Sequence, residues 1–193
     1  MKLYHGSNIG GIMVLEPRQA DHDRPYVYLS TISVVAAFYL CNAVEKPYYW
    51  FPYGFDQSGS IPVYHELYPG ALRQVSEGVK GYIYEVEAEE NQVIPFKNIP
   101  CARLAAEPVE VTGCLEVGNA YELFLKYVEQ GKMRIGRFEE KSEQELGRWY
   151  SMIKAYLKEK EMVRTPDCSY AVFVRNRFPG VWEEYLRENY RKP

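Results

Sequence analysis

The sequence predicts an α+β fold, in which a β-rich body over residues 1–117 precedes a helical extension over residues 118–193. Two observations lead to this prediction. Short runs of β-branched and aromatic residues, separated by Gly, Pro and Asn, fill the first part of the chain, as is typical of strands joined by turns. After Asn119 the apolar residues recur at helical spacing over longer segments. We expect the extension to pack on the body rather than to form an independent domain.

Seven segments of the body are predicted to form strands. The clearest is Gly81–Glu87, where apolar and polar residues alternate as in a strand with one solvated face. The segments 48–55 and 61–66 flank a turn-like Asp56–Gly59 and predict a hairpin. The predicted strands cover residues 1–5, 25–29, 48–55, 61–66, 81–87, 93–96 and 107–115.

Helices are predicted at one place in the middle of the body and throughout the extension. A helix capped by Ser30 or Thr31 runs to about Ala43, with Val34 and Phe38 among the residues facing the core. Residues 70–77 form one or two helical turns. The remaining predicted helices cover residues 119–130, 142–161 and 178–190, the last after a short apolar segment, Tyr170–Arg175.

Composition excludes several classes of protein. The 193 residues are 47% hydrophobic, which suits one domain with a modest appendage. No run of about 18 apolar residues exists, so we expect no membrane span. The 23 basic and 26 acidic residues leave a net charge of −3, which does not imply a broad nucleic-acid surface. Four widely spaced cysteines, together with the lack of an apolar signal region in Met1–His5, indicate reduced core thiols in a cytoplasmic protein without bound metal.

The segments that could carry chemistry are Tyr4-His5-Gly6-Ser7 and Val27-Tyr28-Leu29-Ser30. A histidine at the end of a strand, followed by glycine, places an imidazole beside exposed backbone that a flat ligand can approach. A carboxamide could then bond to the main-chain N–H and C=O groups. The alternative is structural: His5 is a surface or hydrogen-bonded histidine, and Gly6 is a turn residue.

These two segments resemble the ADP-ribosyltransferase superfamily, in the branch with a His-Tyr-Glu triad that includes the poly-ADP-ribose polymerases and the rifamycin ADP-ribosyltransferases. His5-Gly6-Ser7 matches the first motif, and Val27–Ser30 matches the second. Tyr39 stands eleven residues after Tyr28, as a second tyrosine does in the polymerases, whereas Ala36 replaces their helix serine. The segments Gly81–Val86 and Ala106–Val111 are similar to later strands of the rifamycin enzymes. The resemblance covers residues 1–117 and implies a split antiparallel β-sheet.

The resemblance also implies a function, namely transfer of ADP-ribose from NAD, the co-substrate, to an acceptor with release of nicotinamide. It implies that His5 donates a hydrogen bond to a ribose hydroxyl, that Gly6 binds the carboxamide, and that Tyr28 and Tyr39 flank the nicotinamide ring. Ser7 and Ser30 complete the expected NAD-binding set. The acceptor could be a protein, a nucleic acid, a small molecule or water, and the sequence gives no oligomeric state.

The third catalytic position falls on Glu107, which begins a strand after a loop that contains proline. It would accept a hydrogen bond from the nicotinamide ribose and polarise the incoming nucleophile. Its competitors are Glu110, Glu87, Glu85 and Glu89, and the alternative is a solvated charge at the end of a strand.

Two further functions remain open. One is a catalytically inactive module that binds a nucleotide or a partner protein with the same fold. The other is an RNA-repair phosphotransferase, which the net acidity disfavours. The position of Glu107 separates enzyme from inactive module: catalysis requires it in the cleft of His5 and Tyr28, and a solvent-facing Glu107 favours binding. The aromatic residues of 47–69 form either an acceptor wall or a hairpin packed on the core.

Overall fold

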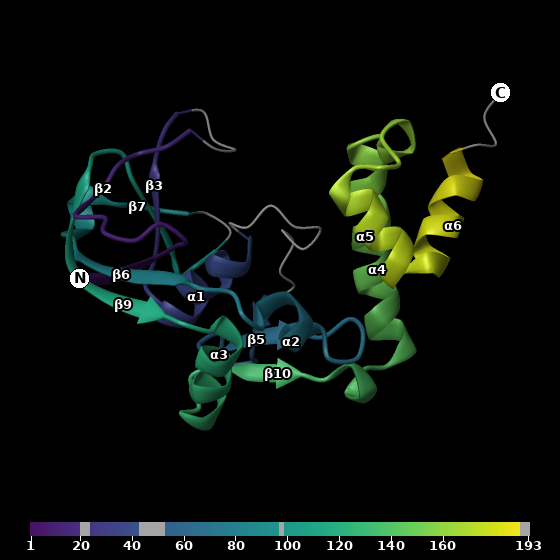
Figure 1. Cartoon of the computed structure of the whole chain (residues 1–193), viewed down its shortest axis with the longest axis horizontal. Helices are drawn as coiled ribbons and strands as arrows, with labels where there is room; N and C mark the ends of the chain where they lie inside the picture. Colours follow the sequence, from purple (N-terminus) through teal and green to yellow (C-terminus); the bar gives the residue numbers. More distant parts are fainter. Residues whose placement is uncertain (20–23, 43–52, 97–98, 190–193) are drawn as a thin grey trace.

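The computed structural model describes residues 1–19, 24–42, 53–96 and 99–189 (Figure 1). Over these ranges it has an α+β fold with six α-helices and mostly antiparallel strands. No helix in these ranges combines the length and the apolar character that a membrane crossing needs.

The body is built on a seven-stranded sheet with the order β2-β9-β6-β1-β3-β8-β7, in which every neighbouring pair is antiparallel. Its strands are β1 (Lys2–Ser7), β2 (Val14–Leu15), β3 (Val27–Ser30), β6 (Gly81–Glu87), β7 (Ile94–Pro95), β8 (Ala102–Ala105) and β9 (Val109–Val117). A short 3-10 helix, η1 (Glu90–Gln92), precedes β7. The predicted strands at 1–5, 25–29, 81–87, 93–96 and 107–115 are confirmed, with small shifts at their ends.

The sheet is divided between β1 and β3. β1 pairs with β6 along its whole length, from Lys2↔Glu87 to Ser7↔Tyr82. With β3 it shares the single register pair Tyr4↔Ser30. If that ladder continued, Gly6 would face Tyr28, but the two strands separate there. The separation leaves room beside the ends of both strands.

Helix α1 (Ser33–Asn42) follows β3 and packs across β1. Its residues Val34, Val35, Ala37 and Phe38 are buried, as predicted. The helix lies very close to β1: a Cβ atom added to Gly6 would come within 2.0 Å of the carbonyl oxygen of Ala36. Glycine at position 6 is therefore required by packing.

A second, three-stranded sheet lies beside the first. Strands β4 (Tyr53–Phe55) and β5 (Pro62–His65) form the described part of the predicted hairpin, and β10 (Arg134–Gly136) pairs with β5 in parallel. Residues 48–52 of that prediction lie outside the described ranges. Helices α2 (Ala71–Ser76) and α3 (Ala120–Glu129) pack on this part of the body and confirm the predictions at 70–77 and 119–130.

The remaining helices form a unit to one side of the body (Figure 1). They are α4 (Glu143–Glu159), α5 (Ser169–Arg177) and α6 (Pro179–Asn189), with the short 3-10 helices η2 (Phe138–Glu140) and η3 (Met162–Arg164). These helices share a hydrophobic cluster of their own, which reaches the body through Leu67 and Tyr68. We call α4, α5 and α6 the helical tail.

The structure divides the chain later than residue 117. Phe124 and Tyr127 of α3 belong to the main core cluster, and β10 belongs to a sheet of the body. The body therefore extends to about residue 136. One cysteine differs from expectation: Cys114 is exposed on β9 and does not belong to the core.

Candidate functional site

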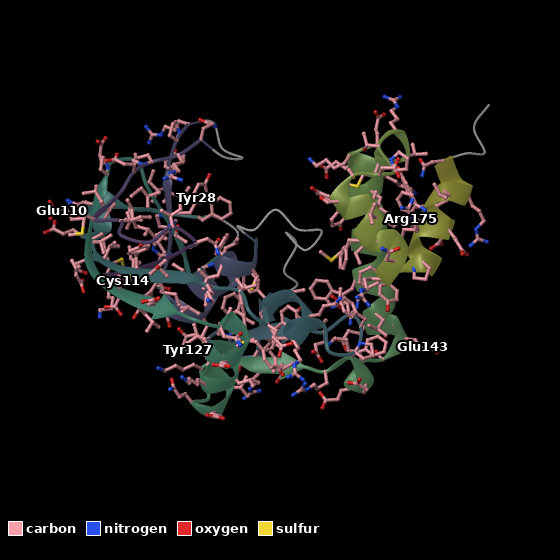
Figure 2. The ribbon with its side chains drawn as sticks, viewed as in Figure 1. Tyr28, Glu110, Cys114, Tyr127, Glu143 and Arg175 are labelled. Atoms are coloured by element: carbon pink, nitrogen blue, oxygen red, sulfur yellow. The ribbon has the colours of Figure 1, made fainter. Side chains whose placement is uncertain are left out.

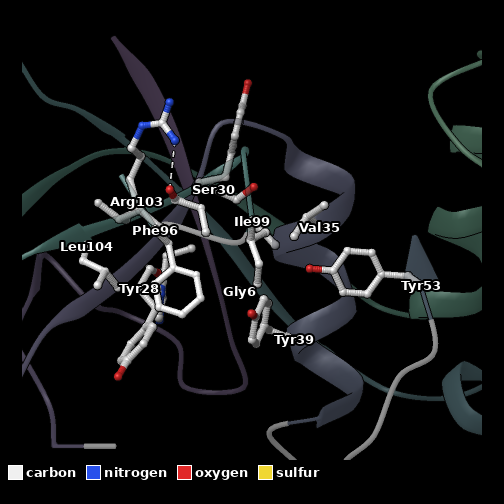
Figure 3. A pocket seen from close by; sticks show the side chains of 15 residues that line it. Gly6, Tyr28, Ser30, Val35, Tyr39, Tyr53, Phe96, Ile99, Arg103 and Leu104 are labelled. Carbon is white, nitrogen blue, oxygen red and sulfur yellow. Dashed lines mark hydrogen bonds between the residues drawn. The ribbon is translucent and has the colours of Figure 1, made fainter. Parts of the chain in front are cut away.

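A cavity of about 400 Å³ opens where β1 and β3 separate (Figure 3). Both strands, helix α1, β4 and the β7–β8 region contribute to its wall. Six of its fifteen lining residues carry rings, and most of the others are apolar. The lining residues are Tyr4, His5, Gly6, Tyr28, Leu29, Ser30, Val35, Ala36, Tyr39, Tyr53, Phe96, Ile99, Ala102, Arg103 and Leu104.

The cavity brings together five of the residues that the sequence analysis assigned to one site. These are His5, Gly6, Tyr28, Ser30 and Tyr39. His5 and Tyr28 also touch directly, because Nδ1 of His5 lies 2.8 Å from the carbonyl oxygen of Tyr28. The expectation that these two stretches of chain meet around one cavity is therefore met by the geometry.

The hydrogen bond of His5 fixes the state of its ring. A carbonyl oxygen can accept but not donate, so Nδ1 carries the hydrogen and Nε2 of the neutral ring is an acceptor. Burial lowers the pKa of His5, and the charge of Arg18 lowers it further, against the opposing effect of the bond to Tyr28. Nε2 of a neutral His5 can therefore accept a hydrogen bond but not donate one, the reverse of the donation that the resemblance implies.

Aromatic rings stand on two sides of the cavity. Figure 3 shows Tyr28 and Phe96 on one side, and Tyr39 and Tyr53 on the other. Tyr39 is 43% exposed although its ring borders the cavity. Partial burial nevertheless raises the pKa of Tyr39, and also that of Tyr53, so both phenols are neutral at pH 7. A planar ligand between these rings would cover the apolar surface that Tyr39 exposes.

The two serines of the expected NAD-binding set have structural partners. Ser30 is buried, and its hydroxyl accepts from the N–H of Ile32 at 3.0 Å in the turn that leads into α1. Ser7 does not line the cavity in the part of the chain that is described. Its hydroxyl accepts from the N–H of Ile9 at 3.1 Å. Both side chains therefore hold turns, and Ser30 additionally forms part of the cavity wall.

Glu107 lies apart from the cavity. It is exposed in the turn between β8 and β9, beyond the end of β8 that pairs with Val27, whereas the cavity uses the residues near the opposite end. Its competitors are also elsewhere: Glu85 pairs with Lys2, and Glu110 lies on β9 across the sheet from Tyr28 (Figure 2). Among the described residues, no carboxylate lines the cavity.

Arg103 is the lining residue of greatest chemical interest that sequence reasoning missed. It lies on β8, opposite Leu29 of β3, and its Nη1 donates to the carbonyl oxygens of Pro100 at 2.7 Å and Ala102 at 2.9 Å. The sequence analysis predicted no strand over residues 102–105, because two alanines, an arginine and a leucine give little sign of one. The cavity lining thus includes an arginine of β8, whereas the resemblance implies an acid in the site.

Comparisons of the chain with protein-family models, with curated proteins and with solved structures found no match.

Proposed function

We propose that the cavity binds the nicotinamide end of NAD, and that the protein is a nucleotide-binding module of ADP-ribosyltransferase type without turnover of its own. The observation that carries this proposal is the convergence of His5, Gly6, Tyr28, Ser30 and Tyr39 on one cavity. Its volume of about 400 Å³ lies within the usual range for small-molecule sites. The divided sheet between β1 and β3 also agrees with the fold that the resemblance implies.

Each part of the ligand has a complement among these residues. The nicotinamide ring would lie between the tyrosines, where stacking of a base on an aromatic ring contributes about 1–3 kcal/mol. A ribose hydroxyl would donate to Nε2 of His5. The carboxamide would bond to the main chain near Gly6, since Ala36 supplies no hydroxyl for it.

The position of Glu107 favours binding over turnover. Breaking the bond between nicotinamide and ribose develops positive charge on the ribose, so catalysis needs a negative charge beside it. The described wall supplies Arg103 and no carboxylate. ADP-ribose transfer is nevertheless the second candidate, because the contact between His5 and Tyr28 joins two of the three residues of the triad.

Titration calorimetry with NAD tests the proposal. We expect Tyr39→Ala and His5→Ala to weaken binding about tenfold or more, because each removes a direct contact with the ligand. Tyr39→Phe keeps the ring and should bind as the wild type does. Equal affinity in all four proteins would contradict the site.

The same samples separate binding from transfer. We expect free nicotinamide to accumulate no faster than in NAD alone, and Glu107→Gln to leave NAD affinity unchanged. Release of nicotinamide by the wild type that Glu107→Gln abolishes would instead establish the transferase and the role of Glu107.

A further inference from the structure

The cavity wall contains a tyrosine hydroxyl to which the proposed function assigns no contact. Tyr53 belongs to β4 of the small sheet, yet its side chain lines the cavity that opens between β1 and β3 of the large sheet. Figure 3 shows the hydroxyl of Tyr53 directed toward the cavity, with its ring behind. Tyr53 therefore presents a polar group to a ligand rather than the face of its ring.

Packing holds the ring of Tyr53 in place. The ring lies 5.0 Å from that of Phe38, which is 1% exposed, and 6.2 Å from that of Phe55. Phe38 belongs to α1, the same helix that carries Tyr39 to the cavity wall. Because the ring is already ordered, a hydrogen bond from its hydroxyl to a ligand costs little further conformational entropy.

The hydroxyl of Tyr53 has no hydrogen-bond partner among the residues that the structure describes. Burial raises its pKa, and the neighbouring groups of Tyr39 and Cys101 raise it further. Cys101 in turn is hydrogen-bonded to Ser30 of the cavity wall. The phenol therefore keeps its proton at pH 7 and can donate it to an acceptor that enters the cavity.

The hydrogen-bonding groups of His5 and Tyr53 differ in kind. Nε2 of the neutral His5 ring can accept but not donate, whereas the hydroxyl of Tyr53 has a proton to donate. Most of the wall around them is aromatic or apolar. A ligand that satisfies both groups combines a flat ring, a hydroxyl that donates to His5 and an oxygen that accepts from Tyr53.

We propose that the hydroxyl of Tyr53 donates a hydrogen bond to a carbonyl oxygen on the ring of the ligand, so that the cavity selects ring compounds that carry a carbonyl group. This inference deepens the proposed function and rests on it for the identity of the ring, in which the carbonyl is that of the nicotinamide carboxamide. The bond adds to those of the main chain near Gly6, since a carbonyl oxygen has two lone pairs. Tyr53 thereby determines specificity.

Three dinucleotides that differ in one group test the inference by titration calorimetry. NAD has the carboxamide, and its 3-acetylpyridine analogue keeps the carbonyl but lacks the amino group. The thionicotinamide analogue has sulfur, a weak acceptor, in place of the oxygen. We expect Tyr53→Phe to weaken NAD and the acetylpyridine analogue about three- to tenfold each, the scale of one neutral hydrogen bond. The thionicotinamide analogue should change by less than twofold.

The acetylpyridine analogue decides the direction of the bond. If Tyr53 accepted a hydrogen from the amino group instead, Tyr53→Phe would weaken NAD and leave this analogue unchanged. That result, equal weakening of all three dinucleotides, or no change in any of them would overturn the inference.

Tyr121→Phe is the matched control. Tyr121 lies on α3, packs against the same core cluster as Tyr53 and is not among the described residues that line the cavity. The variant loses the same hydroxyl group and should bind all three dinucleotides as the wild type does. Thermal unfolding of both variants checks that they fold, which we expect because each keeps its ring.

Acetophenone and ethylbenzene, which differ by the carbonyl group, separate this inference from the proposed function. Suppose that the wild type binds no dinucleotide but prefers acetophenone to ethylbenzene, and that Tyr53→Phe removes the preference. The carbonyl site then stands, and the nicotinamide proposal falls. If the wild type prefers the carbonyl compound in neither set, the inference is wrong, and NAD binding to His5→Ala and Tyr39→Ala alone judges the proposed function.

Discussion

The main chain of α1 passes so close to Gly6 that β1 has no space for a side chain there. A Cβ at this position would meet the carbonyl oxygen of Ala36 at 2.0 Å and its carbonyl carbon at 3.0 Å. Both atoms belong to the backbone, so relief requires the helix to move. The closeness of α1 also places Tyr39 beside the cavity, which ties the packing of this helix to the site.

We therefore expect Gly6→Ala to lower the free energy of unfolding by about 3 kcal/mol, the upper part of the usual range for overpacking. Urea denaturation followed by circular dichroism measures the change. Gly118→Ala is the matched control, because a Cβ there meets nothing within 4 Å, and its effect should stay within about 0.5 kcal/mol. Equal stability of the two variants would show that α1 does not constrain position 6.

At the scale of single residues, sequence reasoning found His5 and the tyrosines of the cavity. It did not predict that Nε2 of His5 is a hydrogen-bond acceptor. His5 and Tyr28 were predictable because each belongs to a short motif on a predicted strand. The acceptor role of His5 was not, because it depends on a bond to a carbonyl oxygen 23 residues away. Gly6 does line the cavity, but the backbone of α1 fills the space on its side-chain side, so the glycine is required by packing as well.

Among the elements, the strand missed by the sequence analysis matters most for the site. β8 has weak intrinsic β-propensity and exists because β3 and β7 pair with its two edges. Such pairing is a property of the assembled sheet, so local composition does not reveal it, and Arg103 was missed with the strand. β10 was missed for a similar reason, since its partner β5 lies about 70 residues earlier.

Where β5 meets the start of α4, the imidazole of His65 lies beside the buried ammonium group of Lys141. We call the contact of His65, Lys141 and Glu145 the β5–α4 joint. Nζ of Lys141 lies 3.4 Å from Nδ1 of His65 and 3.3 Å from Glu145, and its side chain is 3% exposed. The Lys141 ammonium can only donate, so Nδ1 of His65 accepts and the ring is neutral. Burial and the charge of Lys141 lower the pKa of His65, whereas Glu145 opposes them.

This arrangement predicts that the joint loses stability in acid. A histidine whose pKa is lower in the folded protein binds its proton first in the unfolded chain, so the free energy of unfolding falls as pH drops below about 6.5. His65→Gln should reduce this fall, by at most about 1.4 kcal/mol per pH unit. Urea denaturation at several pH values between 7 and 5 measures the slope.

Glu145→Gln should have the opposite effect to His65→Gln on the loss of stability in acid. It removes the group that raises the pKa of His65, so the loss of stability in acid should grow. His5 also has a lowered pKa and contributes to the slope in every one of these proteins. An unchanged slope in His65→Gln would mean that the histidine does not titrate as described.

For the whole molecule, the decisive contact is the one between the body and the helical tail. Tyr68 packs against both core clusters. Its ring lies 6.4 Å from that of Phe173 and 5.8 Å from that of Phe178, and Arg177 lies over it at 5.3 Å. Tyr150 adds a hydrogen bond to the carbonyl of Leu67. A few residues near Leu67 therefore couple two hydrophobic clusters.

Tyr68→Ala should uncouple the tail and destabilise it by about 2 kcal/mol, less than the 3–5 kcal/mol of a fully buried aromatic residue. Trp149 and Trp182 report on the tail by fluorescence once Trp50 is replaced by Phe. We expect this signal to change at a lower temperature than the circular dichroism of the whole chain. Tyr68→Phe keeps the ring and should unfold in one step. A single shared transition in Tyr68→Ala would refute the uncoupling.

The position of β1 at the middle of the large sheet has a consequence for synthesis. Its main partner, β6, ends at Glu87, so about 80 residues separate the two halves of this ladder. At roughly 5–20 residues per second, a ribosome needs several seconds to make that stretch. During this time Leu3 and its neighbours have no strand of β6 to cover them. The nascent chain must therefore be protected from aggregation by chaperones or by the growing chain itself, until this non-local pairing can close.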